Sequence, residues 1–304
     1  MELAYLILPD CILVTIGWLL KNKFKFTAEF FTGLEKLVYF VLFPALMIRS
    51  LTMAPISFAK ASNFLIICLL LAFTGLFFSY LLKKYLRVDP KSIASSGQCA
   101  YRFNTYIGLS LAPAIAGSDS AAVMAILIGF SVPIVNVIAV NSMAKHQGNN
   151  PLIEVLKNPL VLSTIFGLML NFSGITIPAP LNATLAKLSQ STVPLGLICV
   201  GAALILQTGT QQFSLISWLV GIRLLIMPIV AIILAFIFGL NSISSQTLIL
   251  FAALPTASAA YILAVRMGGD GRTVASIISI GTVISVLTLP LWIFISQQLF
   301  PIVP

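Results

Sequence analysis

Three polar residues, Arg102, Asn104 and Thr105, lie in the middle of an apolar stretch where a membrane-spanning helix is otherwise expected, and Tyr106 and Gly108 follow them closely. Polar side chains and broken backbone at membrane depth are tolerated only where they are buried in protein or line a cavity. The stretch therefore predicts a binding site for a solute inside the membrane. The alternative interpretation is a kinked helix whose polar groups are paired with neighbouring helices.

A second break is predicted at Pro255, inside another apolar stretch. Proline cannot donate a backbone hydrogen bond and clashes with the preceding turn, so it breaks or kinks a helix. Thr256, Ser258 and Tyr261 follow it and are candidates for the same site. Small residues at helix crossings can also serve packing alone, and that interpretation stays open for Thr256 and Ser258.

Broken helices offer backbone groups as well as side chains. The half-helix that begins after each break points free N–H groups and a positive dipole end at the gap. If the two breaks cross near the middle of the membrane, two such ends converge and form an anion site without a lysine. The carbonyl groups at the ends of the preceding halves suit a coupling cation.

The composition predicts an integral membrane protein. Of the 304 residues, 59% are hydrophobic and 8% are charged, whereas soluble proteins are roughly 45–50% apolar and about 25% charged. The net charge of +9 does not indicate nucleic-acid binding, because the cations cluster beside apolar spans as in cytoplasmic loops. The single histidine, His146, lies in a loop, and no paired acids or metal-ligand motif are present, which argues against an enzyme and a metal site.

The sequence predicts an all-α polytopic protein with ten transmembrane helices. Positive loops follow the odd-numbered spans, with the exception of the uncharged loop after the seventh, which places both termini outside the cytoplasm. The expected spans cover residues 3–20, 37–54, 61–82, 92–116, 121–143, 159–177, 185–206, 215–240, 247–267 and 273–299.

An internal repeat is predicted between the two halves of the chain, 1–146 and 151–304. GLEKLVYFVLFPALMI (33–48) resembles TLAKLSQSTVPLGLI (184–198), with an offset of 151 that also brings Asn104 onto Pro255. Because five spans per repeat is an odd number, the second copy must cross the membrane in the opposite sense. Inverted repeats with broken fourth and ninth helices are a common plan of secondary transporters. The alternative is a chance likeness between two leucine-rich helices.

Four charged residues inside the spans have two interpretations each. Arg102 and Arg223 lie about ten residues into their spans, or ~15 Å, and could attract an anionic substrate. They could instead snorkel or pair with carbonyl groups at helix ends. Asp10 and Arg49 are expected to form a structural pair, and Asp10 could alternatively be a proton or cation site.

Several motifs resemble the auxin efflux carrier family, namely KLVYFVLFPALMIRSL, YRFNTYIGLSLA, LPTASAAYILAVRMGGD and SVLTLPLW. The resemblance runs over essentially the whole chain, and its specific parts are Asn-Thr-x-x-Gly (104–108) in span four and Pro-Thr-Ala-x-x-Ala-Tyr (255–261) in span nine. One departure is Ser110, where family members often carry proline. The short connection 144–158 is similar to that of the bacterial-type permeases of the family, some of which are linked to malonate or other organic acids.

The resemblance implies a site for a substrate carboxylate at two crossing broken helices. It also implies a dimer of two identical chains in the cytoplasmic (inner) membrane. The resemblance also implies a scaffold part made of spans one, two, six and seven (3–54 and 159–206). The other spans (61–143 and 215–299) form a transport part. We expect a secondary transporter or facilitator of a small organic anion that works by alternating access of the elevator type. The alternatives are a drug/metabolite-type exporter and a membrane sensor that does not transport. Sodium and protons both remain open as the coupling ion, and no other cofactor is expected.

Overall fold

The computed structural model describes residues 2–53, 58–81, 88, 90–144, 153, 159–203, 212–257 and 259–302, and the ordered elements in these ranges are helical. The first half contains α1 (Glu2–Asn22), α2 (Ala28–Leu37), the π-helix η1 (Val38–Leu42), α3 (Phe43–Met53), α4 (Phe58–Leu81), α5 (Pro90–Ser96), the 3-10 helix η3 (Gly97–Ala100), α6 (Thr105–Ala116) and α7 (Ser118–Ala144). The second half contains α9 (Pro159–Ser173), α10 (Ala179–Ala203), α11 (Phe213–Gly221), the π-helix η5 (Ile222–Ile226), α12 (Met227–Ile237), α13 (Ser242–Ala253), α14 (Ala259–Arg266) and α15 (Gly271–Leu299).

Five stretches of helix in the described ranges are long and apolar enough to cross a membrane: 28–53, 62–81, 119–143, 213–237 and 271–299. The chain is therefore a multi-pass membrane protein, as its composition predicted. The helices lie close to the ten predicted spans, with one large difference. The second span was expected to begin at Leu37, but its helix begins at Ala28, where the Thr27 hydroxyl accepts a hydrogen bond from the amide of Phe30.

Two spans contain a π-turn directly before a proline. Pro228 has no N–H to donate to the carbonyl of Leu224, four residues earlier. The Leu224 carbonyl instead accepts a hydrogen bond from Nε1 of Trp292 at 2.7 Å. The widened turn η5, closed by a hydrogen bond from the amide of Met227 to the carbonyl of Ile222, joins α11 to α12 without ending the span. Such π-turns are frequent at functional sites, and Arg223 lies in this one.

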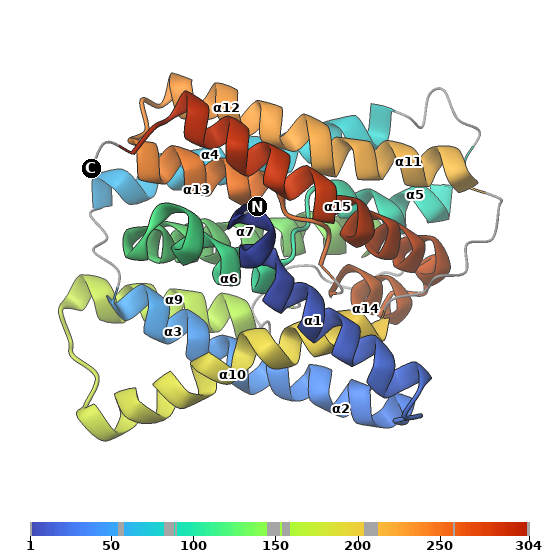
Figure 1. Ribbon diagram of the computed structural model, residues 1–304, viewed down its shortest axis with the longest axis horizontal. Helices are drawn as coiled ribbons and strands as arrows, with labels where there is room; N and C mark the ends of the chain where they lie inside the picture. The colour runs from blue at the N-terminus through green and yellow to red at the C-terminus, as the bar shows by residue number, and fades with distance from the viewer. Residues whose placement is uncertain are drawn as a thin grey trace.

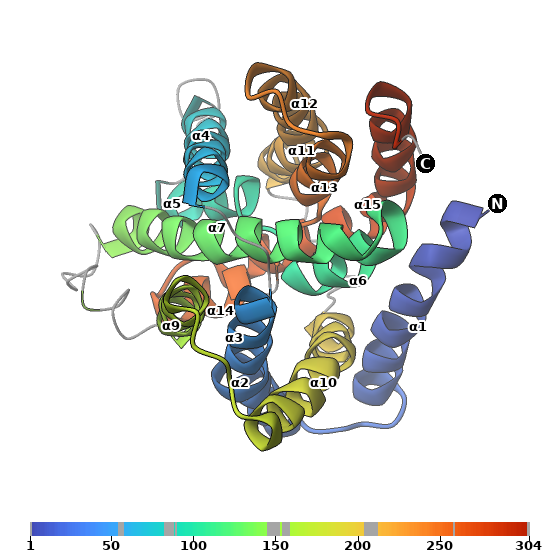
Figure 2. The ribbon, with the colours of Figure 1, turned by 90° about the vertical axis from the view of Figure 1, so that its left-hand side faces the viewer.

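The helices form two groups. Figure 2 shows α1, α2, α3, α9 and α10 together in the lower half of the view and α4, α11, α12 and α15 in the upper half, with α6 and α7 between them. In the lower group α1 crosses α10 and α3 packs along α9 (Figure 1). The backbones of α1 and α10 touch, because a Cβ on Gly17 would lie 2.0 Å from the carbonyl oxygen of Ile198.

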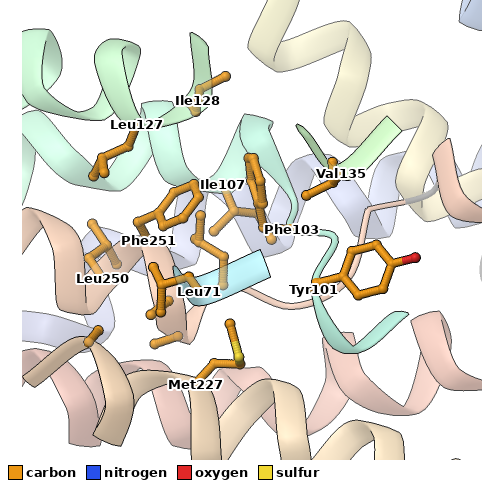
Figure 3. Packing of buried hydrophobic residues seen from close by; sticks show 14 of the residues in the cluster. Leu71, Tyr101, Phe103, Ile107, Leu127, Ile128, Val135, Met227, Leu250 and Phe251 are labelled. Atoms are coloured by element: carbon orange, nitrogen blue, oxygen red, sulfur yellow. The ribbon is translucent and has the colours of Figure 1, made fainter. Parts of the chain in front are cut away.

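The hydrophobic core surrounds the first break in the chain. Figure 3 shows Phe103, Ile107 and Phe251 packed together, with the Tyr101 hydroxyl directed away from them. The rings of Phe103 and Phe251 have centroids 4.3 Å apart. These contacts fix the non-helical segment between η3 and α6 against α13, and they set the position of the polar residues beside it.

Candidate functional site

The first predicted break is present. Helix η3 ends at Ala100, and α6 begins at Thr105 with Asn104 as its N-cap. The Asn104 Oδ1 accepts hydrogen bonds from the amides of Tyr106 and Ile107 at 3.1 and 3.4 Å. Asparagine is among the best N-cap residues because its side chain satisfies amides that have no partner within the helix. The positive end of α6 is therefore held at this residue.

Serine at position 110 leaves α6 helical. Members of the carrier family that the chain resembles often carry proline at this position, and a proline there would interrupt the helix. Helix α6 continues through Ser110 and contains Pro113 before it ends at Ala116. The break is thus set by the segment before Thr105 and by its cap, not by a proline after Gly108.

The second predicted break is present as well. Helix α13 ends at Ala253, residues 254–257 are not helical, and α14 begins at Ala259. Ser258, which the sequence assigned to the site, lies outside the described residues. Pro255 lies in the non-helical segment, as its chemistry predicted.

The two breaks lie against each other, and we call this contact the crossing. The amide of Asn104 donates a hydrogen bond to the carbonyl of Pro255 at 2.7 Å. The Thr256 hydroxyl donates to the carbonyl of Cys99 at 2.8 Å. A Cβ on Gly108 would lie 2.7 Å from Cδ1 of Leu254, so glycine allows the first turn of α6 to approach the second break. Thr256 thus ties the two broken helices together through its side chain.

Two nitrogen donors at the crossing have no acceptor in the part of the chain that the structure describes. They are Nδ2 of Asn104 and Nε of Arg102, both buried. The two residues are 1% and 7% exposed. A buried donor without an acceptor costs about 1–3 kcal/mol, and more when it is charged. A ligand with acceptor atoms could therefore form hydrogen bonds that these two donors lack within the described residues.

The guanidinium of Arg102 is held by α7. Its Nη2 donates to Oδ1 of Asn136, on α7, at 2.6 Å. Among the described residues, the ionisable groups that interact with it electrostatically are Tyr101, Tyr39 and Cys99, and none of these is a carboxylate. The sequence analysis did not single out Asn136, although a lone asparagine in the apolar run VPIVNVIAV was a visible signal.

Arg223 has a different environment. Its Nε and Nη2 donate to the carbonyls of Leu254 and Phe251 at 2.6 and 2.8 Å. These carbonyls lie at the C-terminal end of α13, where the helix dipole is negative and a cation is stabilising. Of the two interpretations of Arg223, this geometry favours pairing with the end of a helix.

Tyr106 faces the lower group of helices. Its ring makes an edge-to-face contact with Phe43 of α3, with centroids 5.6 Å apart. A Cβ on Gly196 of α10 would lie 2.6 Å from the ring, so the ring lies directly on the α10 backbone. Sequence reasoning did not find Gly196, because nothing local marks the helix that an aromatic ring will cover.

The remaining predicted site residues are Thr105, Tyr261 and Asp10. Thr105 is buried as the first residue of α6, and Tyr261 is half-buried in α14. The Asp10 side chain lies outside the described part of the structure, so its expected pairing with Arg49 stays a prediction. In the residues searched, no three His, Cys, Asp or Glu side chains are grouped as metal ligands.

A polar network joins helix ends at the turn between α14 and α15. The Asp270 carboxylate accepts hydrogen bonds from the hydroxyls of Ser92 and Thr273 at 2.9 and 2.6 Å and from the amide of Thr273 at 3.0 Å. Gln212 donates to the Ser92 hydroxyl at 3.1 Å. Burial opposes the charge of Asp270, but these hydrogen bonds, with one from the Arg272 backbone, outweigh it and lower the pKa of the carboxyl.

Comparisons with known proteins cover nearly the whole chain. The profile of a family described as "Membrane transport protein" matches residues 5–293. The uncharacterized transporter YfdV of Escherichia coli K12 is 24% identical, with 96% of each chain covered. A putative malonate transporter of Rhizobium meliloti is 23% identical over 94% of this chain and 93% of its own length. An uncharacterized transporter of Methanothermobacter thermautotrophicus is 25% identical over 94% and 96%.

Proposed function

The chain belongs to the auxin efflux carrier family of membrane transport proteins, and on this premise we propose that it carries a small organic anion across the membrane. The observation that supports this proposal most is the pair of buried donors without acceptors, Nδ2 of Asn104 and Nε of Arg102, at the crossing of the two broken helices. A substrate that brings acceptor oxygens satisfies both donors at once.

The charge of the site favours an anion over a neutral solute. The N-terminal end of α6, capped by Asn104, adds a positive partial charge close to the unpaired donor. Arg102 adds a full positive charge, and among the described residues its ionisable neighbours are Tyr101, Tyr39 and Cys99 rather than a carboxylate. A buried charge without a partner is costly, so an anion that neutralises Arg102 is stabilised in the site.

A carboxylate is the acceptor that fits these donors. It accepts hydrogen bonds at two oxygens, and its bonds to ionised donors are short and strong. A relative is named as a putative malonate transporter, which agrees with a carboxylate substrate. The substrate oxygen is proposed to bind at Asn104 and Thr105, against Pro255 and Thr256 of the second break.

Transport is proposed to proceed by alternating access between two parts of an inverted repeat, a scaffold (3–54 and 159–206) and a transport part (61–143 and 215–299). In support, α1 packs with α10 and α3 with α9, which is the pairing expected from two related halves. Gly117 and Gly268, both at positive φ after α6 and α14, are separated by the same 151 residues as Asn104 and Pro255.

Tyr106 lies where these two parts meet. Its position on α3 and α10, directly after the capped end of α6, brings the proposed substrate site against the scaffold. A movement of one part along the other must move this ring, so binding at Asn104 and movement at the interface are adjacent. The same proposal includes ten membrane spans with both termini outside the cytoplasm. It also includes an assembly of two chains and coupling to sodium or protons.

Charge movement and uptake in proteoliposomes test the proposal. Purified protein is challenged with malonate, malate, lactate and indole-3-acetate, with and without sodium and pH gradients. We expect saturable transport of at least one of these anions and a loss of apparent affinity in Asn104→Ala, because this variant removes the unpaired donor. Absence of both current and labelled uptake for the whole panel would contradict an organic anion transporter.

A further inference from the structure

Two arginines are buried beside the breaks, and they differ in the acceptors that the described part of the chain offers them. Arg223 is 2% exposed and donates two hydrogen bonds to carbonyls at the end of α13. Arg102 is 7% exposed and donates to the neutral carboxamide of Asn136, and its Nε has no acceptor among the described residues. The fold therefore leaves a hydrogen-bond donor and the positive charge of Arg102 available to a ligand.

The capped end of α6 already offers what a single carboxylate requires. Asn104 supplies a donor and the helix supplies a positive end, as in anion sites that contain no basic side chain. Arg102 is then a second positive group, two residues earlier on the same non-helical segment. At about 3.3 Å per residue in extended chain, the two Cα atoms are separated by up to ~6.6 Å. Two carboxylates on one short carbon chain can therefore reach one group each.

We propose that Arg102, oriented by Asn136, binds a second carboxylate, so that the site selects small dicarboxylates over monocarboxylates of the same chain length. This inference rests on the proposed transport of an organic anion and adds the number of charges that the substrate carries. Arg102 contacts the substrate, whereas Asn136 is a positioning residue.

Asn136 fixes which guanidinium donor is available. Its Oδ1, on α7, accepts a hydrogen bond from Nη2 of Arg102 at 2.6 Å. Asn136 is itself 8% exposed, so its own orientation is set by packing. Holding Nη2 at α7 leaves Nε as an unpaired donor of the guanidinium. The hydrogen bond between Arg102 and Asn136 therefore holds the guanidinium in one orientation, with Nε as the free donor among the described residues.

This arrangement provides a near-isosteric test. Asn136→Asp keeps the acceptor oxygen but adds a negative charge that neutralises Arg102 from within the protein. The variant carries its own carboxylate in place of that of the substrate. It should lose its preference for a dicarboxylate while it still accepts a monocarboxylate at Asn104.

The experiment measures binding of malonate and of propionate, which has the same three carbons and one carboxylate fewer, by isothermal titration calorimetry. Purified full-length wild type, Asn136→Asp and Arg102→Gln are compared, with folding checked by size exclusion and circular dichroism. Asn241→Asp is the matched control, since it makes the same change at the exposed N-cap of α13.

We expect wild type and Asn241→Asp to bind malonate at least about tenfold more tightly than propionate, which is the size of one charge-assisted hydrogen bond. In Asn136→Asp and Arg102→Gln this ratio should fall to about one or reverse, as expected when one charge-assisted contact is removed. If Arg102→Gln does not fold, the ratio of malonate to propionate affinity in Asn136→Asp tests the inference by itself.

The possible failures are distinguishable. Equal binding of propionate and malonate by wild type, or an unchanged ratio in Asn136→Asp, would overturn the dicarboxylate inference and leave anion transport standing. Wild type that binds neither these two anions nor any other in the panel would overturn both proposals.

Discussion

Replacing Asn104 with aspartate separates the structural task of this residue from its proposed role in binding. The remaining Oδ1 can still accept from the amides of Tyr106 and Ile107, and aspartate is as good an N-cap as asparagine. The other atom changes from an N–H donor into a negatively charged oxygen. Asn104→Asp should therefore fold like wild type and lose its affinity for anions.

The magnitude follows from the contact that is lost. A hydrogen bond to a charged group contributes about 1.5–3 kcal/mol. At ~1.4 kcal/mol per factor of ten, the dissociation constant for a carboxylate rises about 10- to 150-fold. Repulsion between the new carboxylate and the substrate adds to this value, because both charges would be buried where screening by water is weak. The rise of about 10- to 150-fold in the dissociation constant is thus a lower bound.

The assay is equilibrium binding of radiolabelled malonate to the purified protein, with the unfolding temperature as a measure of folding. Asn241→Asp is the matched control because its Oδ1 caps α13 by accepting from the amide of Ser244 at 2.9 Å, away from the crossing. We expect both variants to unfold near the wild-type temperature and only Asn104→Asp to lose binding. Equal binding by the two variants would refute the assignment of Asn104.

Three further changes test the surroundings of the site. Gly201→Ala would place a methyl group 1.8 Å from the carbonyl oxygen of Val14, so α1 and α10 must separate, at a cost of about 1–3 kcal/mol or more; an unchanged unfolding temperature would contradict the close packing. Gly196→Ala would displace the Tyr106 ring, which lies 2.6 Å from the added carbon, and should slow uptake by proteoliposomes more than it lowers thermal stability; wild-type uptake would argue against this interface. The folded-state pKa of Asp270 is lowered from its ordinary 3.8, so its contribution to stability is full above that pH and is lost as the pH falls toward the folded value. Asp270→Asn should remove this part of the acid dependence of the unfolding temperature, and identical pH profiles would show that the network does not contribute.

The positions of both breaks could be predicted because their causes are local. Asn104 is a polar cap within an apolar run, and Pro255 lacks a donor wherever it is placed. The same local reasoning placed the second span too late. The charges of Glu35 and Lys36 end the apolar run at Leu37, but the helix continues back to Ala28. Apolar runs mark the part of a helix that lipid or protein covers, whereas caps mark where the helix begins.

The roles of the two arginines could not be told apart from sequence. Arg102 and Arg223 lie at similar depths in their spans, and each could have been a ligand or a structural cation. The difference comes from long-range packing: α13 brings two carbonyls to Arg223, and α7 brings a single carboxamide to Arg102. Partners more than 25 residues apart are not matched to each other by any local pattern. Asn136 stands out in its apolar run, but nothing local pairs it with Arg102.

Electron cryomicroscopy of the protein with saturating malonate tests the central claim most directly, because it locates the anion. We predict density for a carboxylate within hydrogen-bond distance of the Asn104 side-chain nitrogen, at the capped end of α6 and beside Pro255. Malonate that is transported but bound elsewhere, with the crossing of the two breaks empty, would contradict the account.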